Sequence, residues 1–185
     1  MGEQHKKHNR REHLNDFHLN VAGEYVYDGA LYACQNDDAK QRRIKRAVWG
    51  MAAILIVAVI AGGCIPAPGM QNCFYVLLPY LGEFLGAASV IWALAKLGMD
   101  WGTVREYNYK KSVAVLPVRT AVTAVFSLLG IVCELIFFFV NDHAGQTFFA
   151  LLYVLLKLIA LLSVLVLRAE IMQAEWDKLP KKNNS

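Results

Sequence analysis

The sequence predicts an all-α membrane protein whose four transmembrane helices form an up-down bundle. Its 185 residues are 56% hydrophobic with a mean hydropathy of +0.34, more apolar than a soluble domain of this length normally is. Four apolar stretches are each long enough to cross the hydrocarbon core of a bilayer, which takes about 20 helical residues. They are Ala47–Ile65, Phe74–Leu97, Val113–Val140 and Thr147–Leu167. Because the segments between them are short, neighbouring spans are expected to run in opposite directions.

The Lys and Arg residues around the spans predict the orientation. Residues 66–73 and 141–146 contain no Lys or Arg, whereas the segments at the other end of the spans are basic. The basic residues there are Lys6, Lys7, Arg10, Arg11, Lys40, Arg42, Arg43, Lys45, Arg46, Arg105, Lys110, Lys111, Arg168, Lys178, Lys181 and Lys182. Cytoplasmic loops carry such an excess. We therefore expect a multi-pass protein of the cell membrane with both termini in the cytoplasm.

The net charge of +4 does not indicate a nucleic-acid partner. The basic residues flank membrane segments, where topology and anionic headgroups already account for them. The lipid bilayer is the partner that the composition predicts.

Residues 1–46 form the predicted cytoplasmic N-terminal region. Its first 20 residues are polar and basic, and such a composition is expected to be disordered. The histidines of this stretch, His5, His8, His13 and His18, lack the cysteine or carboxylate neighbours that would complete a ligand set. We therefore assign no metal site to them.

Two runs of β-branched or aromatic residues follow, Glu24–Tyr27 and Ala30–Tyr32, separated by Asp28-Gly29. Asp-Gly between such runs predicts a β-hairpin before the first span, with a short interfacial helix as the alternative. Residues 36–46 then predict a charged helical lead into that span, capped by Asn36 or Asp37.

Residues 47–168 constitute the predicted transmembrane domain, and residues 169–185 a cytoplasmic helix extension and tail. Apolar residues recur among charges at Ile171, Ala174, Trp176 and Leu179. This pattern predicts that the fourth span continues as a helix beyond the membrane until Pro180 stops it.

Hydrocarbon should reject three charged residues of the apolar stretches, Glu83, Glu134 and Lys157, whereas Arg119 is expected near the cytoplasmic headgroups. At about 1.5 Å per residue, Glu83 and Lys157 lie about 14 and 15 Å from the outer ends of their spans, and Glu134 about 9 Å. An unpaired charge at the bilayer centre costs about 2.5–3.5 kcal/mol, so the three are expected to face the bundle interior, with either carboxylate pairing with Lys157. The cluster is read either as a structural ion pair or as a protonatable site that couples proton movement to a substrate.

The second span carries the marks of a packing helix. Gly82 and Gly86 flank Glu83 with small-xxx-small spacing, which lets helix backbones approach closely. Pro79 interrupts the helix and frees a carbonyl near Tyr75, which a neighbouring hydroxyl, a water or a ligand could bond, with Tyr80 as a candidate neighbour.

Cys64 and Cys73 flank the loop between the first two spans, where two prolines and a glycine favour a tight return. A disulfide between them is expected if that face of the membrane is oxidising. Redox work at these cysteines is a further functional alternative, although the chain has no Cys-x-x-Cys motif.

The sequence contains no Walker motif, His-Glu-x-x-His or Gly-x-Ser-x-Gly, so no enzyme activity and no cofactor is predicted. The leading interpretation is an interaction partner or accessory subunit of a membrane complex. Four spans make a thin bundle, and a homo-oligomer or other membrane protein subunits are expected to help bury the three charges. The alternative is a small transporter or channel with Glu83 as the coupling carboxylate, although the two halves show no inverted repeat.

Overall fold

The computed structural model describes residues 17–19, 25–27, 29–98, 101–141 and 147–179. Its four long helices are α2 (Asp38–Cys64), α4 (Phe74–Leu97), α6 (Leu116–Val140) and α7 (Thr147–Met172). All four are long and apolar enough to cross a membrane, which confirms the number of spans read from the sequence. α2 also includes the predicted charged lead. The helix after the basic loop begins at Leu116 instead of Val113, because Val113–Val115 form a 3-10 turn (η2) ahead of Pro117.

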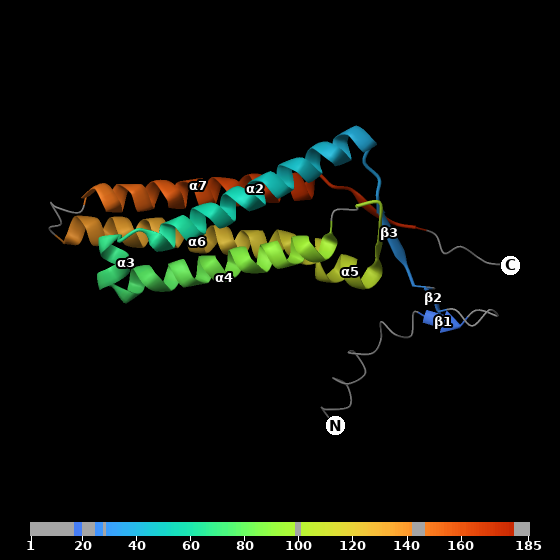
Figure 1. The fold of residues 1–185 in the computed structure, drawn as a ribbon, viewed down its shortest axis with the longest axis horizontal. Helices are drawn as coiled ribbons and strands as arrows, with labels where there is room; N and C mark the ends of the chain where they lie inside the picture. The colour runs from blue at the N-terminus through green and yellow to red at the C-terminus, as the bar shows by residue number, and fades with distance from the viewer. Residues whose placement is uncertain (1–16, 20–24, 28, 99–100, 142–146, 180–185) are drawn as a thin grey trace, which may run out of the picture.

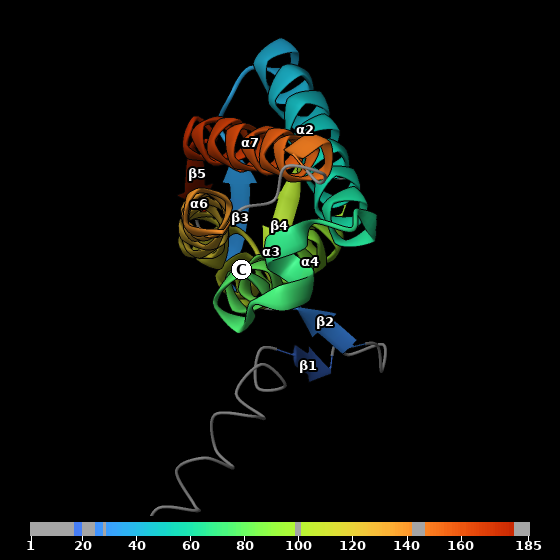
Figure 2. The same ribbon diagram turned by 90° about the vertical axis from the view of Figure 1, so that its left-hand side faces the viewer.

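Consecutive long helices run in opposite directions (Figure 1). α2 packs against α7 and α4, and α6 packs against α4 and α7, so the four helices form a closed ring. Looking along the bundle, the short helix α3 (Pro68–Asn72) lies at the near end and the strands lie at the far end (Figure 2). The short helix α5 (Glu106–Lys111) belongs to the strand end.

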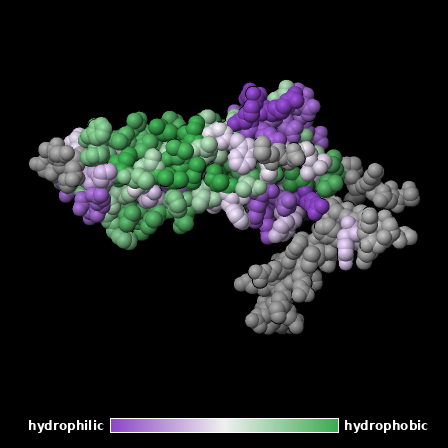
Figure 3. All heavy atoms as spheres, in the orientation of Figure 1, coloured by the Kyte–Doolittle hydropathy of each residue, from purple (hydrophilic) through white to green (hydrophobic). Residues whose placement is uncertain are grey.

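The outer surface of the bundle is apolar over most of its length, and hydrophilic residues gather at the strand end around the start of α2 (Figure 3). Large exposed apolar side chains come from all four helices, among them Val57, Leu78, Leu85, Val125, Leu151 and Leu162. Such a belt suits contact with lipid.

Five short strands are described: β1 (Phe17–Leu19), β2 (Tyr25–Tyr27), β3 (Leu31–Cys34), β4 (Thr103–Arg105) and β5 (Trp176–Lys178). β1 pairs with β2, and a second antiparallel sheet has the order β4-β3-β5. The predicted hairpin between residues 24 and 32 is therefore wrong, because β2 and β3 each pair with other strands. The alternative of a short helix there is also wrong. The expected disorder of residues 1–20 lies outside the described residues except at β1, which is a strand.

The sheet joins three segments that are far apart in the sequence. In register, Tyr32 lies opposite both Val104 and Lys178. The Tyr32 and Tyr109 rings stack with centroids 4.1 Å apart, and the Trp176 ring packs within 6.1 Å of Tyr109. Tyr109 and Trp176 also pack against the apolar core at this end of the bundle.

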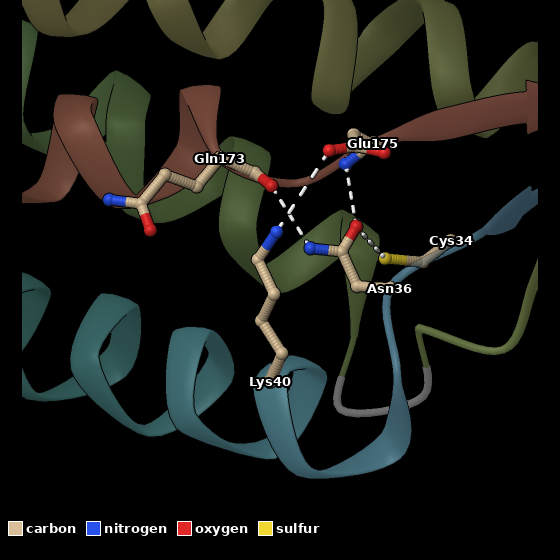
Figure 4. Close-up of polar contacts among 5 residues, drawn as sticks. All are labelled: Cys34, Asn36, Lys40, Gln173 and Glu175. Carbon is tan, nitrogen blue, oxygen red and sulfur yellow. Dashed lines mark hydrogen bonds and ion pairs between the residues drawn. The ribbon is translucent and has the colours of Figure 1, made fainter.

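Asn36 ties the segment before α2 to the segment after α7 (Figure 4). Its Nδ2 donates to the Gln173 carbonyl at 3.0 Å, and its Oδ1 accepts from the Glu175 amide at 2.9 Å. Asn36 is therefore not the cap of α2. The N-cap position is Asp37, whose side chain makes no capping hydrogen bond.

The C-terminal helix extension is shorter than the sequence pattern predicts. α7 ends at Met172, five residues beyond the predicted span, and the chain then forms β5 instead of more helix. The Trp176 ring contacts Tyr109 because a strand places Trp176 opposite Cys34. Pro180 lies outside the described residues.

Candidate functional site: a buried charge cluster

Glu83 of α4 and Lys157 of α7 form an ion pair inside the bundle, joining Lys157 Nζ to Glu83 Oε2. Glu83 is fully buried and Lys157 is 2% exposed. The second carboxylate oxygen, Oε1, accepts a hydrogen bond from the Ser127 hydroxyl of α6 at 2.5 Å. One carboxylate thus connects three helices, and both of its oxygens have partners, which is the condition under which a buried charge is tolerated.

Two aromatic rings complete the surroundings of Lys157. Its Nζ lies 4.5 Å from the ring centroid of Tyr80 and 5.1 Å from that of Tyr153. At these distances the negative faces of the rings attract an ammonium group. Gly130 of α6 lies beside the lysine stem, where an added Cβ would sit 3.7 Å from Lys157 Cε. Lys157 is therefore enclosed by α4, α6 and α7.

Glu134 is the third charge of the cluster, and it pairs differently from Glu83. Its Oε1 accepts a hydrogen bond from the Gly69 amide of α3 at 3.4 Å, and its side chain is fully buried. Either carboxylate could have paired with Lys157 on the sequence alone, and the structure selects Glu83. Glu134 instead attaches the short helix α3 to α6.

Two buried polar atoms near the pair have no hydrogen-bond partner among the described residues. They are Glu134 Oε2 and the Tyr153 hydroxyl, and both side chains are fully buried. Nearly all buried polar groups in proteins are hydrogen-bonded, so unpartnered ones mark places that call for an explanation. We name Glu83, Ser127, Glu134, Lys157, Tyr80 and Tyr153 the inner polar cluster.

Comparison with known proteins adds no assignment for this cluster. No family model, curated protein or solved structure matches the chain. Every functional argument for the inner polar cluster therefore comes from its own residues and their geometry.

The two glycines of the second span lie against α6, as a packing role requires. A Cβ on Gly82 would sit 2.5 Å from the Phe126 ring, and one on Gly86 would sit 3.3 Å from the Thr123 backbone. A larger residue would require the Phe126 ring to move at Gly82, and Thr123 to move at Gly86. Pro79 is buried in the same helix. The Tyr80 hydroxyl donates to the Val59 carbonyl of α2 at 3.4 Å, so this candidate is not the donor to the carbonyl near Tyr75.

All four cysteines of the chain lie in the described residues and are free thiols. The disulfide expected between Cys64 and Cys73 is therefore not formed in this structure. Cys64 is exposed, whereas Cys73 is half-buried.

The sequence reasoning did not single out two members of the inner polar cluster, Ser127 and Tyr153, which contact the ion pair. It also missed Gly69, whose amide donates to Glu134. The missed signal lies on α6, where polar and small residues recur every three or four positions. They are Thr120, Thr123, Ser127, Gly130 and Glu134, and all are among the buried residues of that helix. Such a stripe marks the face of a membrane helix that points away from lipid.

Proposed function

We propose that this small polytopic membrane protein is an interaction partner or accessory subunit of a membrane complex. The observation that carries the proposal is the sheet at one end of the bundle. It gathers the segments before α2, between α4 and α6, and after α7 into one folded unit outside the apolar belt. A protein with a compact anchor and a structured surface beyond it is suited to holding another protein at a membrane.

We place this sheet on the cytoplasmic side of the membrane, with both termini of the chain in the cytoplasm. The strand end carries the basic residues at the start of α2, and the opposite loop around α3 contains none. The distribution of Lys and Arg is the support for this orientation.

The structure removes the need for neighbouring subunits to bury the three charged residues. The sequence led us to expect that neighbouring subunits would be needed to bury Glu83, Glu134 and Lys157. A single chain buries all three, none more than 2% exposed. A partner is therefore proposed from the surface at the strand end and not from any need to cover charge.

The test is gentle detergent extraction at native abundance, followed by mass determination and identification of what stays attached. We expect a stoichiometric partner. Val104→Asp places a charge on the buried face of β4 and should release a partner held by the sheet, whereas Thr103→Val, at an exposed position of the same strand, should retain it. A chain that is recovered alone, or with copies of itself, would contradict the proposal.

A second candidate is a small transporter or channel in which Glu83 is the coupling carboxylate. It is supported by the inner polar cluster, because ionisable residues deep in a bundle are frequent in proton relays and substrate paths. Glu83→Gln should then abolish pH-dependent flux in liposomes. Absence of flux with the parent protein would remove this candidate.

A further inference from the structure

The inner polar cluster contains two carboxylates and one ammonium group, all buried in the same half of the bundle. If all three were ionised, the interior would carry one uncompensated negative charge. An isolated carboxylate in a low-dielectric interior is so costly that it takes up a proton or acquires a cation. The charge count therefore requires one further positive charge.

We propose that this charge is a proton bound at Glu134, exchangeable at the α3 end of the bundle. Glu83 has two charge-stabilising partners, Lys157 and Ser127, so it is the ionised carboxylate. Glu134 has a single neutral donor, the Gly69 amide, and this leaves its Oε2 without a partner among the described residues. A neutral carboxyl fits this arrangement, since its carbonyl oxygen accepts from the amide and its hydroxyl oxygen carries the proton.

A bound metal ion fits the site less well than a proton does. The described residues contain no group of three or more His, Cys, Asp or Glu side chains arranged to hold a metal ion. Hard cations take six or more oxygen ligands, and a single carboxylate against one backbone amide supplies far fewer. The Gly69 amide is itself a donor, which suits a carboxyl oxygen and repels a cation.

The surroundings of Glu134 limit which other groups could neutralise it. Among the described residues in the half of the bundle near α3, the titratable ones are Cys64, Cys73, Tyr75, Tyr80, Glu83, Cys133, Tyr153 and Lys157. α3 itself carries none. Lys157 is the one cation among these groups, and it is bonded to Glu83. No other cation stands among the described residues of this half, so a proton is the charge that we assign to Glu134, whether the protein is an interaction partner or a transporter.

Glu134 is shallow enough to exchange this proton. It lies six residues from the end of α6, about 9 Å along the helix, on the side where α3 closes the bundle. Gly69 sets the position of the carboxyl, because an added Cβ there would overlap Glu134 Oε2. Opening of α3 would expose the carboxyl to the adjacent aqueous phase.

Infrared spectroscopy of the full chain in nanodiscs tests the proposal through the carbonyl stretch of a protonated carboxyl. We expect one such band per chain at pH 7, lost in Glu134→Gln and unchanged in Glu175→Gln, a matched change at an exposed carboxylate. Glu134→Gln is an isosteric mimic of the neutral acid, so it should fold and keep the wild-type Tm at pH 7. Gly69→Ala should shift the frequency of the band.

Thermal unfolding provides the second readout. The Tm of the wild type should be the same in sodium chloride and in choline chloride at equal ionic strength. A carboxyl band that persists in Glu134→Gln would overturn the proposal. A missing band in the wild type would overturn it as well, and a sodium-dependent Tm that Glu134→Gln abolishes would then assign a metal cation to the site.

Discussion

The two halves of the bundle differ in the side chains that fill their interiors. Toward the strand end the interior is mostly apolar, with Ile44, Val48, Leu94, Leu116 and Leu167 each at most 1% exposed beside the buried hydroxyl residues Ser112 and Thr120. Toward α3 the interior contains two carboxyl groups, an ammonium group and a serine hydroxyl, each side chain at most 2% exposed. The same four helices thus pack around an apolar core at one end and a charged core at the other.

This difference indicates which contacts stabilise each half of the bundle. In lipid, apolar helices gain little by exchanging lipid contacts for one another, so close packing and polar contacts decide the arrangement. The strand end adds a sheet and stacked aromatic rings that lie outside the apolar belt. The α3 end has no strand among its described residues, and the Glu83–Lys157 pair and the Glu134–Gly69 contact join the helices there.

The largest effect is expected from Lys157→Leu, which leaves Glu83 buried without its cation. Removing one partner of a buried ion pair costs about 3–5 kcal/mol, and the contacts with the Tyr80 and Tyr153 rings are lost as well. The free energy of unfolding, measured by denaturing-detergent titration, should fall by that amount. A loss below 1 kcal/mol would mean that the pair does not hold the charged half together.

A truncation in the apolar half should cost somewhat less. Leu94→Ala removes a side chain that is 1% exposed, and such core truncations cost about 3 kcal/mol. Leu85→Ala, on the same helix but 67% exposed, is the control and should change the free energy of unfolding by less than about 1 kcal/mol. Equal losses for both variants would contradict the assignment of the core face of α4.

The contact between α4 and α6 is tested by an added methyl group. Gly86→Ala should cost about 1–3 kcal/mol, because its Cβ would press on the Thr123 backbone at 3.3 Å. Gly130→Ala is the matched control, since its nearest neighbour would be 3.7 Å away at ordinary contact distance. Their melting temperatures should separate clearly, and a Gly130→Ala variant that is the less stable of the two would show that the helices pack otherwise.

The smallest effect is expected where Asn36 connects the segment before α2 to the segment after α7. Asn36→Ala removes hydrogen bonds to the Gln173 carbonyl and the Glu175 amide, with an expected local cost of about 1–2 kcal/mol. Hydrogen exchange should speed up at Glu175 while the middle of α7 stays protected. Lys40→Ala breaks only an exposed ion pair of 3.9 Å and should leave exchange within about 0.5 kcal/mol of wild type.

The sequence predicted the four spans because apolar length is a local property. It also predicted that Glu83, Glu134 and Lys157 face inward, since hydrocarbon rejects charge. It did not predict the sheet, because strands of three or four residues are too short to show a period, and β3 pairs with segments some 70 and 140 positions away. The apolar residues of 171–179 fit a helix, yet contacts with distant residues made part of that segment a strand.

The partner of Glu134 could not be predicted for a related reason. The partner is the backbone amide of Gly69, and residue type does not reveal which backbone amide will donate. The sequence also could not show which of the two glutamates pairs with Lys157. That pairing depends on Ser127 and two aromatic rings, whose positions follow from helix packing.

The claim that the charged half is held by a matched pair within one chain is tested most directly by a double-mutant cycle. The free energy of unfolding would be measured for wild type, Glu83→Leu, Lys157→Leu and the double variant. We predict that the double variant is more stable than either single variant, because it leaves no buried charge without a partner at this pair. A double variant that loses the sum of the two single losses would contradict the account.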